Sequence, residues 1–542
     1  ALLILALAFI AAPLAAQQGT LGERIEVRVV NVDVVVTDRD GNRVTGLTRH
    51  DFEILEAQKP QAITNFYEFH DGDASQRPGP DGDLPAPPPR RVVFFIDAQS
   101  LHPYNRGRIA AAVRNFIETQ LNAGDLASVV LWNGALEVVA PLTSDRNVLD
   151  QAVDTVESSG GGGSAIRAGL ARVQSHCVRS LEMARSGGMF IHLAYADCIN
   201  VASGQTVVAA TQSRQLLSAI EMTITTIAGA EGKKFLVLAG AMMPKTPGAE
   251  IYRWANQLFR PFMQGFDAPM ARPHQDDEQN EVLQRVAQTA NANGVTLYTI
   301  AATITTDPSG AEQQHAVDDA GADFFDQGNT FDSYELLASM TGGVAVRKPV
   351  DFDAALATIA RDFQSYYSLG YRPREPSSRE RVLTVRTKNR SHVVRARQTH
   401  VDKTAEQVMS DRVVANVLAP APATSWRTTV HTGAAEAAGP NFAVPIEIVM
   451  EPELTLLPSG PLLAGGFTVY VAVGTPQGAL STVFRQPESV RIQPAEEKAF
   501  RKEPLTFGAT LTVRPGENIV SVGMVDHVSG ATSFARATVV AR

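Results

Sequence analysis

The stretch Arg91–Gly107 reads RVVFFIDAQSLHPYNRG and decides the fold expected for most of the chain. Its apolar run, Val92–Ile96, ends at Asp97 and passes through Gln99 and Ser100 into a helical pattern. A buried strand that turns directly into a helix is typical of the first βα unit of a doubly wound sheet. Ligands of such sheets bind beyond the carboxyl ends of the strands, so Asp97 is a candidate site residue.

Strand and helix patterns alternate after this unit, and we expect one α/β domain over residues 91–373. Leu126–Trp132 and Leu136–Ala140 flank the hairpin signal Asn133-Gly134, which predicts an antiparallel edge strand. A helix is expected over Asp145–Val156, with Ser144 as its N-cap.

Four segments of this domain resemble a von Willebrand factor A domain of the type found in secreted acidobacterial proteins. They are the Asp97-Ala98-Gln99-Ser100-Leu101 motif, the Gly160–Gly163 loop with Ser164, the strand end Ala239-Gly240-Ala241, and the run Ala338–Pro373. The resemblance covers roughly residues 24–400. It implies an adhesion-type domain whose first motif, a loop threonine and a later aspartate together hold one divalent cation.

The metal positions implied by the resemblance are degenerate here. Asp97, Gln99 and Ser164 carry oxygen donors, whereas Leu101 and Gly240 carry none. A divalent cation needs several oxygen ligands, and one carboxylate offers little charge to offset its dehydration. We therefore expect no cofactor, with Mg²⁺ or Ca²⁺ binding as the alternative. Without a metal, the Asp97 side chain is expected to cap the following turn by accepting hydrogen bonds from its backbone N–H groups.

Regions of β pattern flank the α/β domain. Residues 22–70 alternate apolar and polar side chains and predict part of an immunoglobulin-like β-sandwich. Residues 71–90 are rich in Pro, Gly and Asp and predict a linker that tethers this sandwich. A β-hairpin at 380–400 is expected to complete the sandwich, because two strands alone are marginal in water. Residues 425–542 predict a second β-sandwich.

The first residues predict export. Residues 1–18 contain an apolar stretch that ends in small residues, as a signal peptide does; a signal anchor is the alternative. No later run of about twenty apolar residues predicts an integral membrane segment. We expect a secreted or periplasmic protein.

The chain has two cysteines, Cys177 and Cys198. In an oxidising compartment they are expected to form a disulfide, with two buried free thiols as the alternative. Both lie in about seventy residues between Ser164 and the next clear strand, more than one crossover helix needs, so residues 174–204 are predicted to be an insertion. No spacing of cysteines and histidines supports a zinc site.

Composition and motifs narrow the function. A net charge of −9 and a pI near 5.7 disfavour both nucleic acid and an anionic membrane as the main partner of this protein. No HExxH, GxSxG or P-loop motif occurs, so no catalytic residue is assigned. We expect an exported non-catalytic protein that binds a protein or a cell-surface or matrix component. The alternatives are a structural subunit of a homo-oligomeric assembly and an enzyme that carries no sequence motif.

Overall fold

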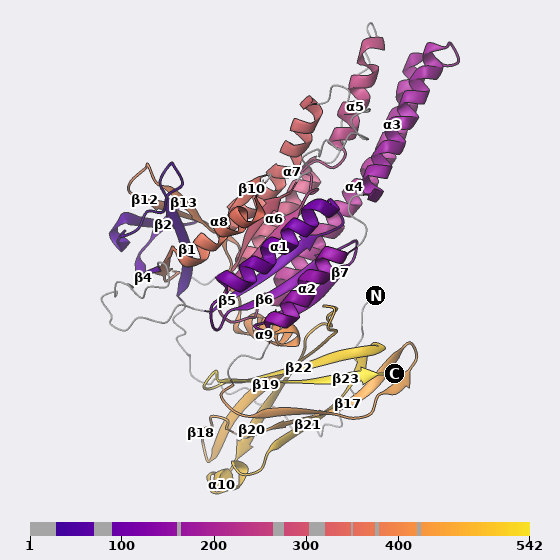
Figure 1. The fold of residues 1–542 in the computed structure, drawn as a ribbon. Coiled ribbons are helices and arrows are strands. Elements are labelled where there is room, and N and C mark those ends of the chain that lie inside the picture. The colour runs from indigo at the N-terminus through magenta and orange to yellow at the C-terminus, as the bar shows by residue number, and fades with distance from the viewer. Residues whose placement is uncertain are drawn as a thin grey trace.

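The computed structural model describes residues 29–69, 89–159, 164–263, 276–302, 320–347, 349, 351–373, 379–419, 424–451 and 453–542. The predicted signal peptide and nearly all of the predicted linker lie outside these residues. The described chain forms an N-terminal β-sandwich, a central α/β domain and a C-terminal β-sandwich (Figure 1).

The central domain is built on a six-stranded sheet with the order β10-β9-β8-β5-β6-β7, in which only the pairing of β7 with β6 is antiparallel. The chain runs from β5 outward to β6 and β7 and then returns to β8 on the other side of β5. This reversal confirms the predicted doubly wound sheet and its antiparallel edge strand. The strands are β5 (Arg90–Asp97), β6 (Leu126–Trp132), β7 (Leu136–Thr143), β8 (Lys233–Gly240), β9 (Val295–Ala301) and β10 (Ala345–Arg347).

Helices cover both faces of this sheet, because alternate side chains of each strand point to opposite faces. On β5, Phe94 and Ile96 enter one apolar core, whereas Val93 and Phe95 enter the other. The first core contains α1 (Pro103–Gln120), α2 (Arg146–Ser158) and α8 (Phe352–Gln364). The second contains α4 (Ile191–Ile227), α6 (Asp276–Ala292) and α7 (Ala320–Thr341).

The N-cap of α2 differs by one residue from the prediction. The Asp145 side chain, and not that of Ser144, accepts the hydrogen bond from the backbone N–H of Asn147, at 2.9 Å. Aspartate and serine cap helices about equally well, so composition alone did not separate the two positions.

The N-terminal sandwich draws its strands from both sides of the α/β domain. One sheet has the order β13-β1-β11-β4 and the other β14-β12-β2-β3, so the predicted 380–400 segment does pair with the N-terminal strands. Their bounds are β1 (Val30–Thr37), β2 (Phe52–Glu56), β3 (Lys59–Gln61), β4 (Ile63–Phe69), β11 (Tyr366–Tyr371), β12 (Arg381–Thr387), β13 (Val393–Ala396) and β14 (Thr399–His400).

Strand β11 differs from the expected domain boundary at residue 373. It pairs with β1 and β4 and so belongs to the sandwich. Its side chains Tyr367, Leu369 and Tyr371 are buried in the sandwich core. The α/β domain therefore ends with α8, because the apolar alternation of β11 matches the face of β1.

The sandwich is fixed to the α/β domain by ion pairs, one set of them around the buried Asp362, whereas the sequence predicted only a tether. Asp362 of α8 pairs with Arg43 and Arg395 of the sandwich. Lys233, at the start of β8, lies 2.9 Å from an Asp33 carboxylate oxygen and 3.0 Å from the ring centroid of Tyr366. These pairs join residues far apart in sequence, which is why the composition of the linker did not reveal them.

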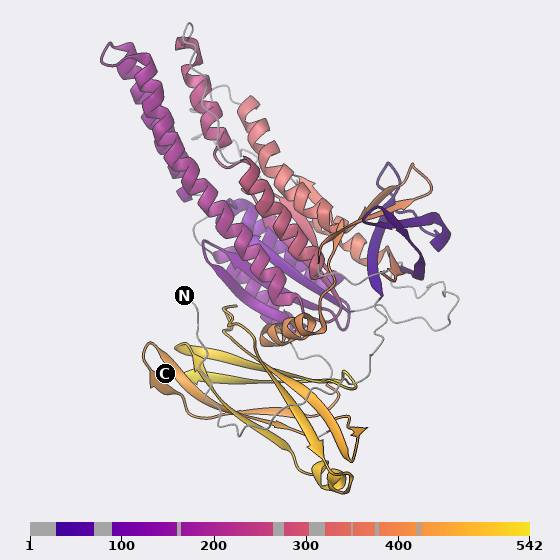
Figure 2. The same ribbon diagram turned by 180° about the vertical axis from the view of Figure 1, so that it is seen from behind.

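Helix α9 (Ala405–Leu418) was not expected and links the α/β domain to the C-terminal sandwich. Its Met409 and Val413 pack with Tyr470 and Phe534 of the sandwich, and its Ala415 joins the α/β core beside α4. Figure 2 shows α9 between the two parts.

The C-terminal sandwich has two antiparallel sheets, and its core contains the alternate residues Val444, Ile446, Ile448 and Met450 of β17. One sheet comprises β15 (Thr428–Thr432), β16 (Glu436–Ala438), β17 (Asn441–Met450) and β21 (Leu505–Val513). The other comprises β18 (Leu457–Ser459), β19 (Leu462–Gly474), β20 (Phe484–Ile492), β22 (Gly516–Asp526) and β23 (Thr532–Ala541).

Candidate functional site

Asp97 lies at the carboxyl end of β5 and is 2% exposed. Its carboxylate accepts hydrogen bonds from the Ser100 hydroxyl, at 2.6 Å, and from the Ser100 backbone N–H, at 3.2 Å. The Ser100 hydroxyl in turn accepts a hydrogen bond from the backbone N–H of Ala241, at 2.9 Å. Asp97 and Ser100 thus fasten the β5–α1 turn to the end of β8.

Two other side chains of the first motif are held by contacts of their own. The amide oxygen of Gln99 accepts a hydrogen bond from the indole N–H of Trp132, at 3.0 Å, which holds Gln99 over the β6–β7 hairpin. Leu101 is fully buried in the apolar core. Gln99 is therefore engaged elsewhere and does not share a ligand position with Asp97.

The end of β8 is closed by Tyr334 of α7. A Cβ atom built on Gly240 would lie 2.5 Å from the Tyr334 hydroxyl oxygen and 3.3 Å from an Asp97 carboxylate oxygen. The tyrosine hydroxyl thus occupies the space into which a side chain at position 240 would extend. Sequence reasoning missed Tyr334, which contacts this site from a helix about ninety residues away.

Burial dominates the electrostatics of Asp97. Loss of hydration raises the pKa of the Asp97 carboxyl from 3.8 to about 7, although the hydrogen bonds from Ser100 oppose the shift. Burial, and next the charge of Asp97, raise the pKa of the Tyr334 hydroxyl well above its usual value. The site is therefore arranged around a carboxyl group that is costly to ionise.

Four positions of the expected metal site lie in the described structure. Asp97 offers one desolvated carboxylate, and the Gln99 amide oxygen already accepts a hydrogen bond from Trp132. Leu101 is a buried apolar side chain, and the space at Gly240 is filled by the Tyr334 hydroxyl. Ser164 is the first residue of α3, but its side chain lies outside the described part of the structure. Within that part, no group of three or more His, Cys, Asp or Glu side chains could hold a metal ion. These four positions do not fit a divalent cation.

The carboxyl edge of the sheet also carries a projecting set of helices, which we call the helical arm (Figures 1 and 2). It consists of α3 (Ser164–Arg185), residues 191–210 of α4, α5 (Ala249–Phe259) and the short helix η2 (Arg260–Phe262). At 1.5 Å per residue the 37 residues of α4 span about 55 Å, against about 26 Å for the eight residues of β8. The arm therefore extends about 30 Å past the sheet.

The arm differs from the predicted insertion at 174–204. It begins at Ser164 and includes α5, because Ile251, Ala255 and Phe259 of α5 share an apolar core with Val173 and Leu181 of α3. A sequence signal was present: no proline occurs between Pro141 and Pro244, so no proline interrupts either α3 or α4.

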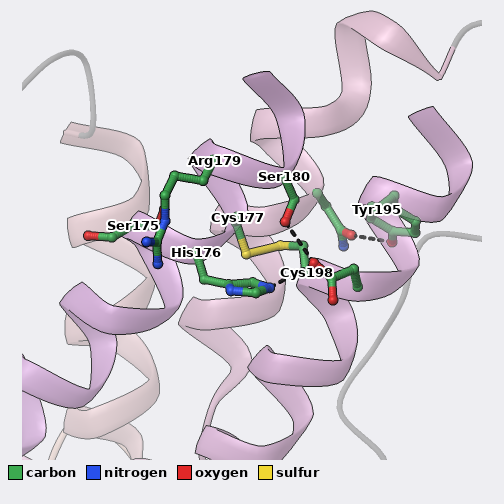
Figure 3. The surroundings of a disulfide bond; sticks show 9 residues. Ser175, His176, Cys177, Arg179, Ser180, Tyr195 and Cys198 are labelled. Carbon is green, nitrogen blue, oxygen red and sulfur yellow. Dashed lines mark hydrogen bonds and ion pairs between the residues drawn. A yellow bond between two sulfur atoms is a disulfide. The ribbon is translucent and has the colours of Figure 1, made fainter. Parts of the chain in front are cut away.

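The arm is held together near its outer end by covalent and polar contacts (Figure 3). The Cys177–Cys198 disulfide joins α3 to α4, with the two Cα atoms 4.7 Å apart. Asp197 accepts a hydrogen bond from the Ser180 hydroxyl and contacts the His176 ring, each at 2.7 Å. The Ser180 hydrogen bond, followed by His176, lowers the pKa of Asp197.

A second contact ties α5 to α4. The Tyr195 hydroxyl donates a hydrogen bond to the Asn256 side-chain oxygen, at 2.7 Å, and the Tyr195 ring lies edge-on to Phe259. The arm is thus a small helical bundle with its own core and a cross-link, and it can hold side chains in fixed positions away from the sheet.

No family model and no curated protein matches this chain. Among solved structures, it is similar to the vWF domain of the type V pili tip protein Mfa5 from Porphyromonas gingivalis, with 13% identity, a TM-score of 0.27, and coverage of 52% of this chain and 96% of that one.

Two other solved structures are also similar. An aerotolerance-related membrane protein from Bacteroides fragilis has 9% identity and a TM-score of 0.23, and the match covers 50% of this chain and 97% of that one. The manganese-loaded TRAP protein of Plasmodium vivax has 11% identity and a TM-score of 0.22, with coverage of 58% and 95%. Because these TM-scores are below 0.5, we infer the function of this chain from its own residues and not from these structures.

Proposed function

We propose that this is an exported, non-catalytic protein that binds another protein through the carboxyl edge of its α/β domain, without a divalent cation. The closed Asp97 site is the observation that supports independence from a cation. Its carboxylate bonds to Ser100, and the Tyr334 hydroxyl fills the space at Gly240. Among the residues that the structure describes, no group of three or more His, Cys, Asp or Glu side chains could hold a metal ion.

The binding surface that we assign is the base of the arm, where α4 passes the carboxyl edge of the sheet. Gly248, in the loop after β8, contacts Thr206 of α4, which places this level of the arm beside the strand ends. Val207 and Val208 of α4 and Met242 of the same loop are large apolar side chains that remain exposed there. Exposed apolar groups beside a rigid sheet edge are typical of protein-binding surfaces.

Capture and reconstitution test the proposal. The full-length protein is cross-linked in an envelope extract of its source organism, and the captured protein is identified, purified and titrated against it. We expect the same affinity in Mg²⁺ and in EDTA, and at least a tenfold loss for the Val207→Ser, Val208→Ser double variant. An affinity that disappears in EDTA, or one that the double variant leaves unchanged, would contradict the proposal.

A further inference from the structure

The outer end of the helical arm carries a cluster of exposed apolar side chains, which we call the arm tip. It consists of Met183 at the end of α3, Phe190 and Leu193 at the start of α4, and Phe262 of η2. Phe190 is the most exposed of them, at 72%. Ordinary folding places such side chains in a core, so their gathering at the point farthest from the sheet requires another explanation.

The backbone of the tip is well defined. Gly187 adopts a left-handed conformation, φ 81°, and the N–H of Gly188 bonds to the carbonyl of Met183, at 2.9 Å. This is the C-terminal cap by which α3 stops and the chain reverses into α4. Phe190 then stands at the N-cap position of α4, where its side chain makes no capping hydrogen bond. The turn therefore holds Phe190 outward on a fixed support.

Charge near the tip has the opposite sign to that of the whole protein. Residues 179–193 and 260–262 contain three arginines and one carboxylate, whereas the complete chain has a net charge of −9. The guanidinium of Arg185 lies 5.7 Å from the ring centroid of Phe262, which places a cation directly beside the apolar side chains. The next carboxylate along α4, Asp197, is engaged by Ser180 and His176.

The size and make-up of the tip suit a lipid surface. With about 200 Å² for each large side chain, exposed fractions of 72, 50, 47 and 40% give on the order of 400 Å² of apolar surface. Insertion of a few apolar side chains between lipid headgroups, with arginines at the level of the phosphates, needs only a small apolar surface of this kind.

We propose that the arm tip binds the surface of a lipid bilayer that contains anionic headgroups. Phe190, Leu193 and their neighbours enter the headgroup region, and the arginines beside the tip, Arg185 among them, contact lipid phosphates. The tip lies on the bilayer and does not cross it: no helix among the described residues is long and apolar enough to cross a membrane. The net negative charge of the whole chain disfavoured an anionic membrane in the sequence analysis, because a net charge does not show that one part of the surface is positively charged.

Vesicle sedimentation with the full-length protein tests this inference. We expect binding to phosphatidylcholine vesicles that contain phosphatidylglycerol, at least tenfold weaker binding to pure phosphatidylcholine, and weaker binding as salt is raised. The Phe190→Ser, Leu193→Ser double variant should bind the anionic vesicles at least tenfold less well. Tyr104→Ser is the matched control, because Tyr104 is 62% exposed on α1, and it should bind like the wild type.

Three results would overturn the inference. They are wild-type protein that stays in the supernatant, equal binding to both kinds of vesicle, and a double variant that binds like the wild type. Light scattering separates the other occupants: a dimer or a protein complex that the double variant abolishes would make the tip a protein contact instead. Binding of a partner protein through Val207 and Val208 is measured separately. A protein that does not bind vesicles would therefore contradict this inference without contradicting the proposed function. Circular dichroism confirms that each variant is folded.

Discussion

The ionisation of Asp97 should cost folding free energy as the pH rises. The carboxyl group has a reference pKa of 3.8 and a folded-state pKa of about 7, so the folded protein holds a proton that the unfolded chain releases. This contribution is fully present below pH 3.8 and is lost as the pH rises through about 7. The difference between the two pKa values corresponds to about 4 kcal/mol in total, and to about 3 kcal/mol between pH 5 and pH 9.

Asp97→Asn removes the titrating group and keeps the size of the side chain. The amide can still hydrogen-bond to Ser100, so we expect the variant to gain stability relative to the wild type as the pH rises from 5 to 9. The gain should approach about 3 kcal/mol, or roughly 6–12 °C in melting temperature for a domain of this size. Comparing variant with wild type at each pH cancels the titration of all other groups.

Tryptophan fluorescence in urea is a suitable assay, because the three tryptophans lie in different parts of the chain. Trp132 is in the central sheet, Trp254 in the arm and Trp426 in the C-terminal sandwich. In a Trp254→Phe, Trp426→Phe background, the signal reports the α/β domain alone. Asp145→Asn is the control: it changes an exposed N-cap carboxylate to an equally good cap, and its stability difference should stay near zero.

A difference between Asp97→Asn and wild type that stays constant from pH 5 to pH 9 would refute this reasoning, because the carboxylate would then ionise as easily folded as unfolded. The same pH series tests whether the Asp97 site binds a divalent cation. A bound Mg²⁺ or Ca²⁺ would favour the ionised carboxylate, so if millimolar cation removed the pH dependence, the conclusion that the site does not fit a cation would be wrong.

Three further predictions concern the junction, the arm and the closed site. Asp362→Ala should lower the free energy of unfolding by about 3–5 kcal/mol, because it leaves two arginines of the sandwich without their buried partner; urea unfolding measures this. Cys177→Ser with Cys198→Ser should lower the stability of the arm by about 3 kcal/mol, since the cross-link closes a loop of 21 residues; limited proteolysis should then cut α3 or α4 first. Gly240→Asp should destabilise the domain by several kcal/mol through its clash with the Tyr334 hydroxyl, and Tyr334→Phe in that background should recover part of the loss in thermal melts.

Each of these has a control or a contrary outcome. Glu53→Gln breaks an exposed ion pair with Arg386, and it should change the free energy of unfolding little; an equally small effect of Asp362→Ala would show that the junction is not buried. Arm cleavage at the same rate with and without the disulfide would contradict the second prediction. A Gly240→Asp variant as stable as the wild type would mean that the Tyr334 hydroxyl does not fill that space.

The sequence by itself determined the local elements and the fold of the central domain. The run Val92–Ile96 followed by Asp97 and a helix, and the Asn133-Gly134 hairpin, depend on side-chain periodicity and turn chemistry within a few residues. The loss of ligand side chains at Leu101 and Gly240 was also visible, because it is a matter of which atoms each residue carries.

Only the tertiary structure decided the features that join distant segments. Sequence patterns could not show that Tyr334 closes the site at Gly240, that β11 leaves the α/β domain for the sandwich, or that Asp362 fastens the two together. The same holds for the arm, whose apolar tip forms where the ends of three helices meet. Periodicity reports which face of an element is apolar, whereas the partner of that face, or its exposure, depends on how the whole chain packs.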